Sequence, residues 1–112
     1  MNARLTSAVL ASALLRLAER EGGFGAVLAK GDPTAGAIGI ILLEKGANPR
    51  FFERLLQLDG NYAWTESWQD IENEDDLRNR LARRRRSDPD LWLIELDIAS
   101  GERFAAEMNA LC

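Results

Sequence analysis

The residue types best able to do chemistry in this chain of 112 residues are carboxylates, because the sequence contains no histidine. Its single cysteine, Cys112, is the last residue. These absences exclude a histidine general base, a serine–histidine pair and the usual histidine and cysteine ligands of zinc. Catalysis would therefore rest on aspartate and glutamate, assisted by a hard cation such as Mg²⁺.

The best-spaced carboxylates follow Pro89. Asp90 lies at the start of a predicted strand, and Glu95 and Asp97 share one face of that strand. The arrangement is reminiscent of the proline-aspartate nuclease motif, which binds metal, but Asp97 stands where that motif has lysine. The solvated face of an edge strand gives the same spacing. A metal-dependent hydrolase using Asp90, Glu95 and Asp97 is thus a second alternative, and we expect no cofactor.

Charge is ordered unevenly between residues 66 and 86. Six acids are followed by six arginines, namely Glu66, Asp70, Glu72, Glu74, Asp75 and Asp76, then Arg78, Arg80, Arg83, Arg84, Arg85 and Arg86. The order complements the dipole of a helix over 74–86, which explains it without a ligand.

The alternative function is contact with RNA through Arg83, Arg84, Arg85 and Arg86, with tryptophans such as Trp64, Trp68 or Trp92 stacking on bases. The net charge of −4 disfavours nucleic acid as a partner, because binding to phosphates requires positive charge.

The segment from Lys30 to Gly36 is rich in turn-forming residues. Its backbone N–H groups could cradle a phosphate, but the G-x-x-x-x-G-K-[ST] pattern is absent. We interpret the segment as a hairpin turn in which Pro33 sets φ.

Hydrophobic periodicity predicts an α+β fold in one domain over residues 1–112. The expected elements are a helix over 6–21, strands over 24–28, 37–43, 51–58 and 62–68, a helix over 74–86, a strand over 91–98 and a short closing helix. We expect the first four strands to form an antiparallel meander. The result is an antiparallel sheet of about five strands, with the N-terminal helix packed on one face and a second, charged helix before the last strand.

The N-terminal twenty residues imitate a secretory signal, with Ala11-Ser12-Ala13 resembling a cleavage site. Leu14 and Leu17 continue the apolar stripe past that site at helical spacing, so we expect a helix of the domain instead. No apolar run is long enough to span a membrane, and one cysteine cannot form an internal disulfide. We expect a cytoplasmic protein without a membrane partner.

A sheet covered by a helix on one face leaves the other face open. Tyr62, Trp64 and Trp68 alternate along one predicted strand and could form an exposed aromatic surface there. We therefore expect a non-enzymatic binding or interaction module that self-associates, as a homodimer, or binds a protein partner.

Three segments of the sequence resemble a known family. They are S-A-L-L-R at 12–16, G-G-F-x-A-V-L-x-K-G-D-x-x-A-G at 22–36 and D-P-D-L-W-x-x-E at 88–95. Together they resemble a small bacterial family known as domain of unknown function 1491. The resemblance implies a bacterial, cytoplasmic, single-domain protein, and it carries no activity, cofactor or site residue.

Overall fold

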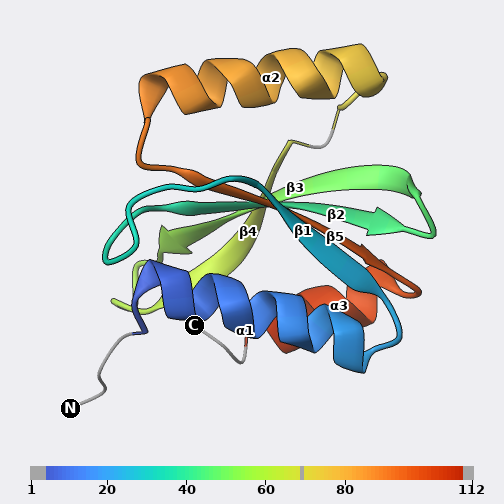
Figure 1. The fold of residues 1–112 in the computed structure, drawn as a ribbon, viewed down its shortest axis with the longest axis horizontal. Coiled ribbons are helices and arrows are strands. Elements are labelled where there is room, and N and C mark those ends of the chain that lie inside the picture. The colour runs from blue at the N-terminus through green and yellow to red at the C-terminus, as the bar shows by residue number, and fades with distance from the viewer. Residues whose placement is uncertain (1–4, 69, 110–112) are drawn as a thin grey trace.

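A computed structural model describes residues 5–68 and 70–109. They form three layers, in which one sheet lies between helices. The elements in chain order are α1 (Ser7–Arg20), β1 (Phe24–Ala29), β2 (Ile38–Glu44), β3 (Ala47–Leu56), β4 (Tyr62–Trp68), α2 (Glu74–Ser87), β5 (Trp92–Ile98) and α3 (Gly101–Met108). Helices α1 and α3 lie on one face of the five-stranded sheet, and α2 lies on the other (Figure 1). The predicted α+β class, the N-terminal helix and the charged second helix are confirmed.

The strand order is β1-β5-β2-β3-β4, so the predicted meander is wrong at its first step. The strand β5 inserts between β1 and β2, antiparallel to β1 and parallel to β2. Its side chains are buried on both faces, including Leu93, Ile94 and Leu96, and such a strand favours the centre of a sheet. By contrast, β1 alternates between half-buried and exposed residues, which suits an edge.

Helix α1 begins where the Thr6 side chain accepts a hydrogen bond from the N–H of Val9 and ends before Gly22, which has φ of +83°. Its buried stripe includes Leu10 and Leu14 and packs over β1 and β5. Together with α3 it encloses the larger apolar core. None of the helices in the described ranges is long and apolar enough to cross a membrane.

The opposite face of the sheet is covered too, so the expectation of a sheet with one open face is wrong. A second apolar cluster contains Ile41, Phe51 and Leu93, and Leu77 and Leu81 of α2 pack against it. Two leucines one helical turn apart are enough to hold a highly charged helix on the sheet. The apolar runs of β2 and β5 require cover on both faces, and α2 supplies the second cover.

The pairing of β3 with β4 contains a bulge near its end. Phe52 lies opposite Glu66, whereas Phe51 lies opposite Trp68, so β4 has one extra residue between these pairs. The extra residue reverses the alternation of side chains. Trp64 therefore packs in the core on the α1 side, and Trp68 packs in the cluster beneath α2.

Candidate functional site

Two of the four arginines predicted to contact RNA are used inside the protein. The Arg85 guanidinium donates to the carbonyls of Pro89 and Leu91, each at 2.6 Å, and of Lys30 at 3.1 Å. Arg84 lies on the inner side of α2, where its Nη2 is 2.7 Å from Oε1 of Glu53 in β3.

The other two arginines of that run, Arg83 and Arg86, are exposed, and their side chains have no ion pair or hydrogen bond with the residues that the structure describes. The sequence prediction treats the four as one set. An α-helix of 3.6 residues per turn rotates successive side chains by about 100°, so the four arginines point in different directions around α2.

Arg80 is the most strongly paired arginine of α2. Its Nε lies 2.9 Å from Asp76, one turn earlier, and its Nη1 lies 2.9 Å from Asp70, before the helix. The hydrogen bonds from Arg80 hold the pKa of both carboxyl groups below the ordinary aspartate value and raise the pKa of Arg80 itself. Arg80, in the middle of α2, is thereby tied to the first turn of the helix and to the segment before it.

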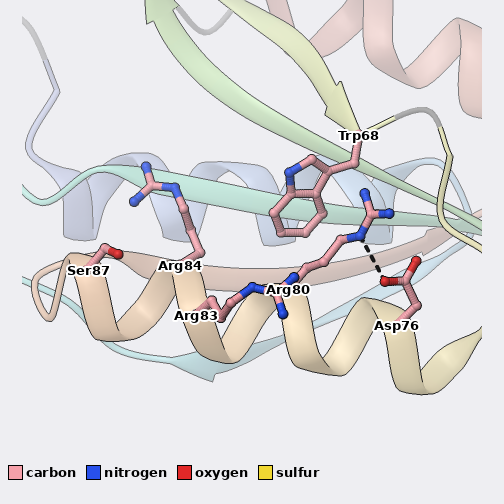
Figure 2. Close-up of a pocket in the computed structure, with 6 residues that line it drawn as sticks. All are labelled: Trp68, Asp76, Arg80, Arg83, Arg84 and Ser87. Carbon is pink, nitrogen blue, oxygen red and sulfur yellow. Dashed lines mark hydrogen bonds and ion pairs between the residues drawn. The ribbon is translucent and has the colours of Figure 1, made fainter.

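A shallow depression of about 410 Å³ lies where α2 passes the end of β4. Its lining residues are Trp68, Asp76, Arg80, Arg83, Arg84 and Ser87, drawn in Figure 2. The Trp68 ring stacks on Phe51 with 4.0 Å between centroids and 17° between planes. Sequence reasoning missed Arg80 and Ser87 as members of this site, although spacings of three, four and seven residues from Arg80 place Arg83, Arg84 and Ser87 on one side of the helix.

The predicted aromatic surface of Tyr62, Trp64 and Trp68 does not form. Trp64 is only 6% exposed, and the bulge directs Trp68 to the opposite face of the sheet. Tyr62 remains half-buried at the start of β4, where the Arg54 guanidinium lies 4.9 Å from its ring centroid. Strict alternation along β4 predicts a shared face, and one extra residue removes it.

The carboxylates considered for metal binding are also spread apart. Asp90 precedes β5 and Asp97 lies near its far end, so about 23 Å of extended chain separates them. Asp97 accepts a hydrogen bond from the N–H of Gly46 at 3.0 Å, and Glu95 lies beside it on the same face. Within residues 5–68 and 70–109, no three acidic or cysteine side chains gather as a metal site would require.

Most N–H groups of the segment from Lys30 to Gly36 donate hydrogen bonds within the protein. The N–H of Asp32 donates to the carbonyl of Asp90, and the Asp32 carboxylate accepts from Thr34 and Ala35. The Trp92 indole N–H in turn donates to the carbonyl of Asp32 at 2.8 Å. The segment is a structural junction with β5, and the donors that a phosphate cradle would need are already bonded.

A groove of about 470 Å³ lies at the end of the molecule where α1 begins. It is lined by residues of the α1 N-terminus, the β1–β2 loop and the strands β2, β3 and β4, including Leu5, Ile38, Arg54 and Tyr62. These segments meet in Figure 1 at the end of the sheet where the β3–β4 turn projects. Of the lining residues, the sequence singles out Tyr62 and the turn-rich residues 34–36, but not Leu5 or Arg54. The nearby run Leu55-Leu56-Gln57-Leu58 beside a turn is itself a signal of exposed apolar residues.

The chain is similar to a DUF1491 family protein from Caulobacter crescentus CB15 in two structures. The NMR structure has 31% identity, covers 92% of this chain and 94% of the other, and has a TM-score of 0.77. The crystal structure has 32% identity, covers 89% of this chain and 94% of the other, and has a TM-score of 0.79.

The solution structure of Atu0922 from A. tumefaciens is similar over 91% of this chain and 92% of the other, at 27% identity and a TM-score of 0.75. No curated protein matches the chain. The family model described as protein of unknown function (DUF1491) matches residues 5–106. The sequence resemblance is therefore confirmed, and the chain belongs to the DUF1491 family.

Proposed function

We propose that this protein is a non-enzymatic interaction module that self-associates through the end of the molecule that carries the β3–β4 turn. The observation that carries the proposal is the clustering of apolar side chains there. Three of the seven large apolar side chains exposed in the described ranges lie at this end, namely Leu5, Leu56 and Leu58; Leu5 lines a groove with Tyr62, and Leu56 pairs with Tyr62. We call the part formed by Leu5, Arg54, Leu56, Leu58 and Tyr62 the hairpin-end surface.

The hairpin-end surface combines a projection with a recess. Leu58 lies in the β3–β4 turn and is fully exposed, and Leu56 beside it is 61% exposed. The groove between Leu5 and Tyr62 lies a few residues away along β3 and β4. Two copies related by a twofold axis can each insert a turn into the other's groove, because an isologous interface needs both shapes on one patch.

Charge on this surface is also self-complementary. Arg54 lines the groove and contacts the Tyr62 ring, and its side chain forms no ion pair within the described residues. Asp59 follows Leu58 in the turn and is exposed, with its carboxylate accepting only the N–H of Asn61 among those residues. Insertion of the turn into a second copy's groove would bring Asp59 to Arg54 of that copy. Such pairs set the register of an interface.

A charge exchange tests the proposal. Arg54→Glu and Asp59→Arg should each weaken the dimer by roughly tenfold in Kd, because each places like charges together. The double variant should restore the wild-type Kd in sedimentation equilibrium, since every copy again presents opposite charges. Single variants that leave the Kd unchanged would contradict the proposal. A double variant in which the losses of dimer affinity from the two single variants simply add would also contradict it.

The other two functions stay untested predictions with less support. For RNA contact, only Arg83 and Arg86 of the four predicted arginines are exposed without a side-chain partner among the described residues. For a hydrolase, Asp90 lies too far from Glu95 and Asp97 to share one cation with them.

A further inference from the structure

The depression between α2 and β4 lies apart from the hairpin-end surface and has a different chemistry (Figure 2). From its geometry we propose that it binds a nucleotide, with the base stacked on Trp68 and the phosphate held by Arg83. The inference does not depend on self-association.

Trp68 forms the floor of the depression. One face of its ring packs on Phe51, which fixes the orientation of the indole. Figure 2 shows the ring seen face-on, with Arg80 and Arg84 on either side of it. The Arg80 guanidinium lies over the ring at 5.8 Å from the centroid. The Trp68 side chain is half-buried, so part of the ring stays open beside Phe51 and Arg80. A base on that part would contact an immobile aromatic surface beside a guanidinium plane, the pairing that binds nucleobases without sequence preference.

The rim contains the guanidinium groups of Arg80 and Arg84, which the protein already holds in position, and the Asp76 carboxylate, which is paired with Arg80. Asp70 and Asp76 fix Arg80, and Glu53 fixes Arg84 through two contacts to one carboxylate oxygen. A guanidinium carries five N–H donors, so Arg84 keeps donors free after these contacts. Because these arginines are preorganised, a ligand would not have to order them.

Arg83 supplies the positive charge that is not held in an ion pair. It lines the depression, is exposed, and its side chain has no ion-pair partner among the described residues. Ser87, one turn later, adds a hydroxyl to the same rim. A phosphate between these groups would receive charge-assisted hydrogen bonds. The volume of about 410 Å³ is within the range of small-molecule sites.

The test is an NMR titration of the tryptophan indole N–H signals. Trp64 and Trp92 are buried, so the Trp68 signal reports on the depression, and Trp68→Phe assigns it. The probes are AMP, adenosine, inorganic phosphate and a short single-stranded oligoadenylate. AMP should shift the Trp68 signal saturably with a Kd of about 1 mM or below, and adenosine and phosphate should each bind roughly tenfold more weakly.

Arg83→Gln should weaken AMP binding roughly tenfold, whereas Arg86→Gln should leave it within about twofold. The two arginines belong to the same run and lose the same charge, but Arg86 does not line the depression. Both are exposed, so both variants should keep the wild-type melting temperature. Tighter oligoadenylate binding that also depends on Arg83 would support the same chemistry, with a strand as the source of the nucleotide.

Three results would overturn the proposal. They are no saturable shift of the Trp68 signal with any probe, equal losses in Arg83→Gln and Arg86→Gln, and phosphate binding as tightly as AMP. The last result would show that the ring takes no part.

Discussion

Arg85 connects α2 to the loop before β5 and to the loop after β1 through its three backbone acceptors. Arg85→Ala should lower the free energy of unfolding by about 2 kcal/mol, because carbonyls bonded to a charged donor lose that donor. The matched change Arg86→Ala should cost less than about 0.5 kcal/mol, since the Arg86 side chain is exposed. Urea denaturation of both variants measures the difference, and equal losses would show that Arg85 does not hold the loops.

Arg80 makes stability depend on acid pH through its two carboxylate partners. The pKa of Asp70 and Asp76 is lowered in the folded state, so the unfolded state takes up protons first as the pH falls. The contribution is therefore fully present above about pH 4 and is lost as the pH falls through the lower folded pKa values.

Replacing Arg80 tests this pH dependence. Arg80→Gln should raise the pKa of both carboxyl groups, measured by NMR titration of the carboxyl carbons. The stability difference from the wild-type protein should be larger at pH 7 than at about pH 3. A difference that stays constant over this range would mean that the ion pairs do not couple protonation to folding.

At the scale of elements, two of the three segments that carry the family resemblance, 22–36 and 88–95, meet in space. The loop after β1 packs against the loop before β5, where Asp32 and Trp92 exchange hydrogen bonds with the opposite segment. Gly31 and Gly36 both lie against the Asp90 carbonyl, so a Cβ atom at either position would collide with backbone. The motif that identifies the family thus explains how β5 is held beside β1. It explains nothing about ligand binding.

Local sequence patterns predict the helices and strands well, but they do not predict which distant strands pair. Apolar spacing and caps define α1 and α2 to within a residue or two, as for Asn73, whose side chain caps α2. The insertion of β5 between β1 and β2 depends on contacts between residues about 60 positions apart, such as Asp32 with Trp92. The sequence has no local signal for such a pairing.

The candidate sites show the same limit. The charge order of α2 predicts a helix with arginines in its last turn, and the structure has it. Which arginines are free depends on the face of α2 that meets the sheet, and that face is set by Leu77 and Leu81. Likewise, because of the single extra residue in β4, Trp68 lies on the α2 side of the sheet, whereas Trp64 lies on the other side.

At the scale of the whole molecule, helices lie on both faces of the sheet (Figure 1), and Phe24 and Leu28 on the edge strand β1 stay exposed. The edges differ. The N–H of Trp64 in the edge strand β4 donates to the Asn109 side chain at 2.8 Å, and the other edge strand, β1, ends its regular pairing at a bulge after Val27. Both features discourage edge-to-edge pairing of sheets. We therefore propose contact with a second copy through the exposed apolar residues of the hairpin-end surface, and not through a sheet edge.

The most direct test is the mass in solution, measured by light scattering behind a sizing column over a range of concentrations. We predict about 25 kDa, twice the chain mass of 12.5 kDa, for the wild-type protein at high concentration. Leu58→Lys should return the mass to that of one chain, and Leu28→Lys, at an exposed leucine on the edge strand β1, should leave the dimer intact. A wild-type monomer at every concentration, or a dimer that Leu28→Lys breaks and Leu58→Lys does not, would contradict self-association through the hairpin-end surface.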